Sequence, residues 1–240
     1  MRAGGLTELL QRNSALRTVF GDRPELRTRL GELQAWQAQR LGRTHADLHE
    51  STRYRRAVEF FFGELYGGKD PRARDRDLQR VQRIMERLLP REALRALSLA
   101  IELEILTQEL DADVTRALPD GPITDETYGI AYRRANRRAD RQRQLALLYE
   151  IGSFLDDVVR KPLTHTLVRL ARGPAHAAGL GHLQEFLERG LVAFESMHGA
   201  REFLDLVRDR EQHALEELFA GEPEPVAADA DTSDTRTESK

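Results

Sequence analysis

The chain has 240 residues, of which 40% are hydrophobic and 32% charged, a composition typical of one soluble globular domain. It contains no cysteine, which excludes disulfide bonds, thiolate catalysis and cysteine-ligated zinc. The net charge of −3 arises in residues 221–240, where six acidic side chains accompany two basic ones, so the rest of the chain is nearly neutral. A uniformly basic nucleic-acid-binding domain is therefore not indicated.

Helical periodicity extends over nearly the whole chain. Ala, Leu, Arg and Glu dominate, β-branched residues are scarce, and no stretch alternates for long with a period of two. The sequence therefore predicts an all-α fold, a single bundle of about seven to nine helices. The expected helices cover residues 6–20, 24–41, 47–66, 71–89, 90–118, 124–159, 162–173, 180–198 and 200–219.

Breaks in this pattern set the boundaries. The segment from Pro119 to Pro122 is the clearest interruption, and Thr124 then caps a long helix with a kink expected near Gly152. Beyond residue 220 the composition turns to Pro, Ala, Asp, Thr and Ser, with no large apolar residue after Val226. We therefore expect one all-helical domain over residues 1–220 and a disordered acidic tail over 221–240.

The cellular location is predicted from what the apolar segments lack. The amino-terminal segment has helical spacing rather than the continuous apolar core of a secretory signal. The longest apolar runs are far too short to span a bilayer. We therefore expect a cytoplasmic protein without membrane contact.

Five aromatic residues fall within thirteen positions of a chain that is only 6% aromatic. At 100° per residue, Tyr54 and Phe61 share one helix face, whereas Phe60 points well away from it. Tyr54 and Phe61 are thus expected in the core, while Phe60 and Tyr66 need a second partner. Two interpretations remain open: a helix buried between two others, or a pocket or partner groove with Phe60 or Tyr66 at its rim.

This stretch resembles the signature of an uncharacterised bacterial family known by its FFLEELY motif. The motif stands here as Phe61-Phe62-Gly63-Glu64-Leu65-Tyr66-Gly67. Lys161-Pro162-Leu163 and residues 179–188 are similar to the family as well, and the resemblance covers about residues 30–220. It implies an all-helical protein with no assigned activity, cofactor or catalytic residue. Gly63 departs from the family pattern and weakens the helix by about 1 kcal/mol relative to alanine.

Three carboxylates fall on helix faces where burial is expected. Glu104 and Asp111 lie on a narrow polar strip of the helix over 90–118, and Glu211 falls among leucine and valine residues of the last helix. A buried carboxylate must find a partner or shift its pKa. Each of the three is either half of a structural ion pair or a functional group.

The histidines form no complete pattern of metal ligands. A di-iron bundle needs two Glu-x-x-His pairs, and we find one, at residues 195–198. His45 and His49 are one helical turn apart but have no obvious third ligand. We therefore predict no metal and no cofactor. His165 is expected at the surface, on the side opposite Leu163, Leu167 and Leu170.

Five arginines recur within the long helix predicted over 124–159. They fall within about 140° of one helix face. This face either binds an anion or is solvated and paired with neighbouring carboxylates. Because no stacking aromatic residue is interleaved, nucleic acid is not favoured as a partner. The five are Arg133, Arg134, Arg137, Arg138 and Arg141.

The sequence favours a non-enzymatic cytoplasmic binding or scaffold protein that acts through its helical surface, as a homodimer or with another protein. This function predicts an exposed apolar patch or dimer face that includes Phe60. The alternative is a small-molecule- or cofactor-binding helical-bundle enzyme with a closed cavity lined by Tyr54, Phe61, Glu104 or Asp111. An enzyme is the less favoured class, because no phosphate loop, nucleophile elbow or dinucleotide-binding fingerprint occurs.

Overall fold

The computed structural model describes residues 12, 23–65, 91–177 and 181–221. Within these residues the chain is helical and has no strand, which confirms the predicted all-α class. None of these helices is both long and apolar enough to cross a membrane. Tyr66, the predicted helices over 6–20 and 71–89 and the predicted tail lie outside the described residues. The nine helices of the described part are α2 (Pro24–Thr44), α3 (Ala46–Glu50), α4 (Arg55–Leu65), α6 (Arg91–Ala117), α7 (Asp125–Ala135), α8 (Arg138–Val159), α9 (Thr164–Ala177), α10 (Gly181–Glu195) and α11 (Arg201–Ala220).

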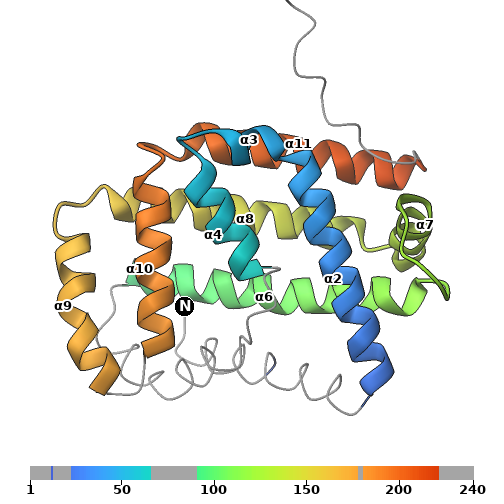
Figure 1. The fold of residues 1–240 in the computed structure, drawn as a ribbon, viewed down its shortest axis with the longest axis horizontal. Helices are drawn as coiled ribbons and strands as arrows, with labels where there is room; N and C mark the ends of the chain where they lie inside the picture. The colour runs from blue at the N-terminus through green and yellow to red at the C-terminus, as the bar shows by residue number, and fades with distance from the viewer. Residues whose placement is uncertain (1–11, 13–22, 66–90, 178–180, 222–240) are drawn as a thin grey trace, which may run out of the picture.

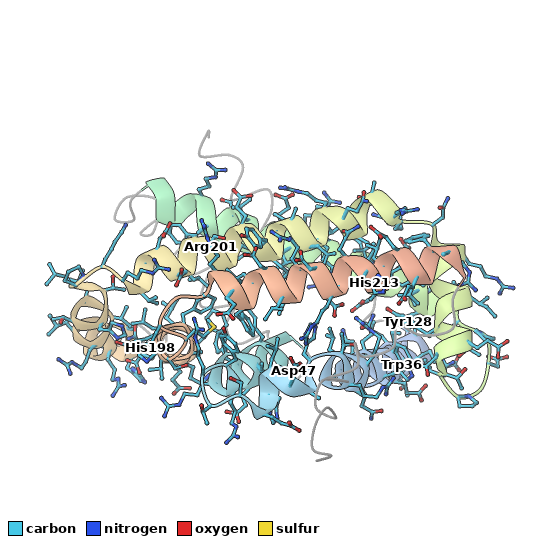
Figure 2. The ribbon with its side chains drawn as sticks, turned by 90° about the horizontal axis from the view of Figure 1, so that it is seen from above. Trp36, Asp47, Tyr128, His198, Arg201 and His213 are labelled. Atoms are coloured by element: carbon cyan, nitrogen blue, oxygen red, sulfur yellow. The ribbon has the colours of Figure 1, made fainter. Side chains whose placement is uncertain are left out.

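The helices form two crossed layers (Figure 1). Helices α6, α8 and α11 lie side by side with α8 in the middle, and α2, α4 and α10 cross over them. The view from above separates the same two groups (Figure 2). Helix α9 stands at one edge of the molecule beside α10, and α7 lies at the opposite edge.

The hydrophobic core has two main parts. The first joins α3, α4, α8, α10 and α11 around the buried side chains of Phe194 and Met197. The second joins α2, α6, α7 and α11 around Leu33. There the rings of Trp36 and Tyr128 lie 4.2 Å apart between α2 and α7 (Figure 2). Helix α11 runs along both parts and so connects them.

The long helix predicted over 124–159 is in fact two helices. Asn136 ends α7 in the left-handed conformation, with φ of 50°, and α8 begins at Arg138. Asparagine tolerates this conformation because its short polar side chain bonds locally. Thr124 caps α7 as predicted. Helix α8 continues through Gly152, where an added methyl group would clash with a leucine of α11.

Phe60 is covered by α10 of the same chain. Its ring centroid lies 5.4 Å from that of Phe186, and a Cβ atom added to Gly190 would come within 3.0 Å of its tip. The glycine therefore permits the close crossing of α4 and α10. Phe60 is partly buried as a result, so α10 supplies the second neighbour that the sequence required.

Helix α9 turns the opposite side from the expected one toward the protein. His165 is partly buried, with Nε2 at 3.4 Å from Oε1 of Glu195 on α10. Leu163, Leu167 and Leu170 are exposed instead. A hydrogen bond from Gln184 to the backbone of α9 and an ion pair between Arg172 and Glu188 connect α9 to α10 in this orientation.

Candidate functional site

A cavity of about 140 Å³ lies where the two parts of the core meet, between the two helical layers. Its walls come from α2, α3 and α4 on one side and from α7, α8 and α11 on the other. Helix α11 lines it over most of its length, at positions that share a helix face. The lining consists of Gln37, Arg40, Leu41, His45, Leu48, Val58, Phe61, Tyr128, Tyr132, Arg141, Gln144, Leu145, Leu148, Tyr149, Phe203, Leu204, Val207, Arg208, Glu211, Ala214, Leu215 and Leu218.

A hydrogen-bonded network of three side chains forms part of the cavity wall. Oε2 of Glu211 accepts a hydrogen bond from Nη2 of Arg40 at 2.7 Å, and Oε1 lies 2.9 Å from Nε2 of His45. Arg40 is 9% exposed and His45 is 2% exposed, so the network is shielded from bulk water. It links the carboxyl end of α2 to the middle of α11. We call it the Arg40–His45–Glu211 network.

Two opposing effects set the pKa of Glu211. Burial raises it, but the charge of Arg40 and the hydrogen bond from His45 outweigh burial and lower the pKa to about 2. Glu211 is therefore an anion near neutral pH and can only accept hydrogen bonds. It follows that His45 donates through Nε2, which leaves Nδ1 on the other edge of the ring.

Gln37 and His45 of the lining each bury one polar atom that has no hydrogen-bonding partner among the described residues. The two atoms are Nδ1 of His45 and Oε1 of Gln37. Both residues are more than nine-tenths buried, at 2% and 4% exposure. Buried polar atoms are normally paired, and leaving one unpaired costs about 1–3 kcal/mol. These atoms therefore mark positions where the polar group of a bound molecule would be stabilised.

Asp111 stands behind the cavity wall. Its Oδ1 accepts a hydrogen bond from Nε2 of Gln37 at 3.2 Å, which fixes the amide of that side chain. Burial raises the pKa of Asp111, against the lowering influence of Arg141 and of the glutamine hydrogen bonds. The carboxyl group thus positions Gln37 without lining the cavity itself.

Arg141 and Tyr132 complete the polar part of the wall. The guanidinium of Arg141 lies 4.8 Å from the centroid of the Tyr132 ring and donates to Oε1 of Gln144 at 3.1 Å. Gln144 in turn donates to Oγ1 of Thr107 on α6. Burial raises the pKa of Tyr132, so its hydroxyl keeps its proton and can donate a hydrogen bond.

A family model describing a domain of unknown function, DUF8198, matches residues 17–225. The chain belongs to the DUF8198 family. No curated protein matches it, and no solved structure does. All the cavity-lining residues fall within the matched region of this chain. The FFLEELY motif family and the bacterial source stay predictions from the sequence.

The DUF8198 fold disperses the residues that the sequence predicted for a pocket. Phe61 lines the cavity and stacks on Phe203, with ring centroids 5.9 Å apart. Tyr54 is buried beside the same phenylalanine but does not line the cavity. Glu104 accepts a hydrogen bond within α6 and also lies outside the lining. Asp111 approaches the cavity through Gln37, as described above.

The break between α7 and α8 separates the five arginines of the predicted anion-binding face. Arg133 donates to a carbonyl oxygen at the end of α11, and Arg137 pairs with carboxylates of α6 and α8. Arg138 lies over an aromatic ring of α11, and Arg134 is exposed. Of the five, the lining of the cavity includes Arg141 alone.

Sequence reasoning missed Gln37 and Arg40. Both follow Leu33 at positions i+4 and i+7, the spacing of one helix face, and all three are buried. Polar residues at positions that share a helix face with a leucine are the sequence signal that could have identified Gln37 and Arg40.

His45 was weighed as a metal ligand together with His49, but the first is buried and the second is exposed. The described residues contain no group of three side chains that could hold a metal ion.

Proposed function

We propose that this DUF8198 protein is a non-enzymatic binding protein that holds a small amphipathic molecule between its two helical layers. The observation that carries the proposal is the lining of the cavity, where a buried polar network adjoins apolar walls. Ligand sites typically combine mostly apolar walls with a few fixed polar groups. An apolar body would pack against Phe61 and Phe203, and a polar end would be held by His45, Gln37 or Tyr132.

The volume of the cavity limits the size of this ligand. A volume of about 140 Å³ is close to that of a cavity of ~150 Å³ that holds benzene. A single small ring or a short branched chain with one polar substituent therefore fits. Nucleotides, flavins and haem are far larger, which supports keeping the prediction of no cofactor.

The charges of the lining favour binding over acid–base catalysis. A catalytic acid or base works best when its pKa lies near the working pH. The pKa of Glu211 is about 2, so this carboxylate acts as a permanent counter-ion to Arg40. Asp111 has a raised pKa but stands outside the lining. Neither carboxylate is thus suited to take up and release the protons of a ligand in the cavity.

A matched pair of substitutions tests whether the cavity is real space that a ligand can use. Ala214 lines the cavity and is 2% exposed, whereas Ala131 is 0% exposed, packs within the second part of the core and does not itself line the cavity. Ala214→Met is expected to change the free energy of unfolding by less than about 1 kcal/mol, because the side chain enters the cavity. Ala131→Met is expected to cost about 1–3 kcal/mol through overpacking. Urea denaturation measures both.

Ligand binding, measured by the melting temperature, provides a second test of the cavity. Phenol, benzoate and benzylamine are ring-sized probes with three different polar ends, and a bound probe raises the melting temperature in proportion to its occupancy. We expect at least one of them to stabilise the wild-type protein and none to stabilise Ala214→Met. Equal destabilisation by both methionines, together with no response to any probe, would refute the proposal.

Binding through the helical surface, the function that the sequence favoured, is supported at α9 rather than at Phe60. The ring of Phe60 is occupied by its contacts with α10, whereas α9 exposes three leucines. A homodimer or a protein partner and a cytoplasmic location stay proposals that rest on the sequence.

A further inference from the structure

Helix α9 and the residue before it present an apolar stripe to the outside of the molecule. Leu163, Leu167 and Leu170 are 67%, 63% and 68% exposed. Their i, i+4, i+7 spacing places them within about 60° of one helix face. The stripe is about 10 Å long at 1.5 Å per residue. Single exposed leucines are ordinary, but three in one row form a patch.

The opposite side of α9 is held against α10 by polar contacts. Nε2 of Gln184 donates to the carbonyl oxygen of Val168 at 2.6 Å, and Arg172 forms a two-pronged pair with Glu188. The hydrogen bonds from Arg172 lower the pKa of Glu188 to about 2. A surface helix normally turns its apolar side inward and its polar side outward. The leucine side of α9 is thus left without a partner among the described residues, and an external partner can bind there.

Charge identifies the chemistry of that partner. Residues 160–177 contain four basic residues and no acidic one. Arg160 and Arg172 are paired with Asp156 and Glu188, whereas Lys161 and Arg169 are exposed beside the leucines. A second copy of the chain, meeting this helix through its own α9, would bring like charges together. An anionic surface would instead be attracted to these basic residues.

The size of the exposed leucine stripe favours an anionic lipid surface over an anionic protein as the partner. Helix α9 lies at an edge of the molecule (Figure 1), and the three leucines are exposed there. Three leucines along about 10 Å of helix offer little area for a specific protein interface, which commonly buries about 800 Å² on each partner. A fluid lipid surface adapts to an exposed apolar helix side, and basic amphipathic helices bind lipid in this way.

We propose that α9 docks the protein on the surface of an anionic lipid membrane. The leucines enter the boundary between headgroups and acyl chains, while Lys161 and Arg169 meet lipid phosphates. The docking is peripheral and reversible, because three leucines are a weak anchor that needs the added charge. It is independent of the cavity and departs from the sequence-based expectation of no membrane contact.

Vesicle sedimentation tests this proposal with the full chain. Wild-type protein is expected to bind vesicles of phosphatidylcholine with added phosphatidylglycerol, and to bind phosphatidylcholine alone much more weakly. The triple variant Leu163→Gln, Leu167→Gln, Leu170→Gln is expected to lose roughly 100-fold in partition constant. The control Leu187→Gln alters a leucine of α10 that is 45% exposed and is expected to leave partition unchanged.

Substitution of the basic residues, together with variation of the salt concentration, provides a second test of the proposal. The double variant Lys161→Gln, Arg169→Gln is expected to weaken partition at low salt, and its binding is expected to depend less on salt than that of the wild type. Because the altered side chains are exposed, circular dichroism is expected to show unchanged helix content for every variant.

Two outcomes overturn the proposal. One is failure of the wild-type protein to bind anionic vesicles, or equal binding by the triple variant. The other is self-association of the wild-type protein in analytical ultracentrifugation that the triple variant loses, while neither protein binds vesicles. This result would assign the leucine stripe to a second copy of the chain.

Discussion

Replacing Glu211 by alanine is expected to lower the free energy of unfolding by about 3–5 kcal/mol, the largest effect that the structure predicts for a single polar side chain. The substitution leaves the guanidinium of Arg40 buried without this counter-ion and removes the acceptor of His45. Urea denaturation followed by circular dichroism measures the loss. Glu216→Ala, an exposed change on the same helix, is the control and is expected to cost less than about 0.5 kcal/mol. Similar losses in the two variants would show that the network contributes little.

The pH dependence of stability provides a second test of the same carboxylate. The pKa of Glu211 is about 2 in the folded chain against an ordinary value of 4.5, so the unfolded chain takes up this proton first as pH falls. Its contribution, about 3 kcal/mol, is therefore complete above pH 4.5 and is lost as pH falls toward 2. Asp111, whose pKa is raised, acts in the opposite direction. Comparison with Glu211→Gln isolates the Glu211 contribution, because the variant is expected to lose less stability over this interval.

Replacing Phe61 by alanine is expected to cost about 3–5 kcal/mol of unfolding free energy. The ring is surrounded by three other phenylalanines, Phe60, Phe194 and Phe203, with centroids 5.7 to 5.9 Å away. Truncation removes these ring contacts and leaves a void that the neighbouring helices fill only in part. Because Phe61 also lines the cavity, the void enlarges the candidate ligand site.

The control for Phe61 is Leu163→Ala, which shortens an apolar side chain that is 67% exposed. Its expected cost is within about 0.5 kcal/mol. Guanidinium or urea denaturation compares the two variants. A cost below about 1 kcal/mol for Phe61→Ala would mean that the aromatic cluster is not a packing centre of the fold.

The fold class was predictable because it depends on periodicity, whereas helix ends depend on single residues. Helical spacing of apolar residues located α2, α6, α10 and α11 to within a few residues. The break at Asn136 was missed because asparagine also occurs inside helices, so the residue type alone does not predict the left-handed conformation that ends α7 here. The inverted orientation of α9 was missed for a related reason: amphipathicity gives the two sides of a helix but not which side meets the protein.

The candidate site was predictable only in part. Phe61 and Glu211 stood out because an aromatic cluster and a carboxylate among apolar residues are visible in one segment. The partners of Glu211 were not, because Arg40 is 171 positions away and His45 is 166 positions away along the chain. Only the crossing of α2 over the layer that contains α11 brings these groups together. Long-range contacts of this kind leave no periodic trace in a single sequence.

Native mass spectrometry of the purified wild-type protein tests the central claim most directly. If the cavity holds a small amphipathic molecule, the native mass exceeds that of the chain by a compound of roughly ten non-hydrogen atoms, the size that a cavity near 140 Å³ accepts. This added mass is expected to disappear on acid denaturation and to be absent from Ala214→Met. A native mass equal to that of the chain alone, both as purified and after incubation with phenol, benzoate and benzylamine, would contradict the claim.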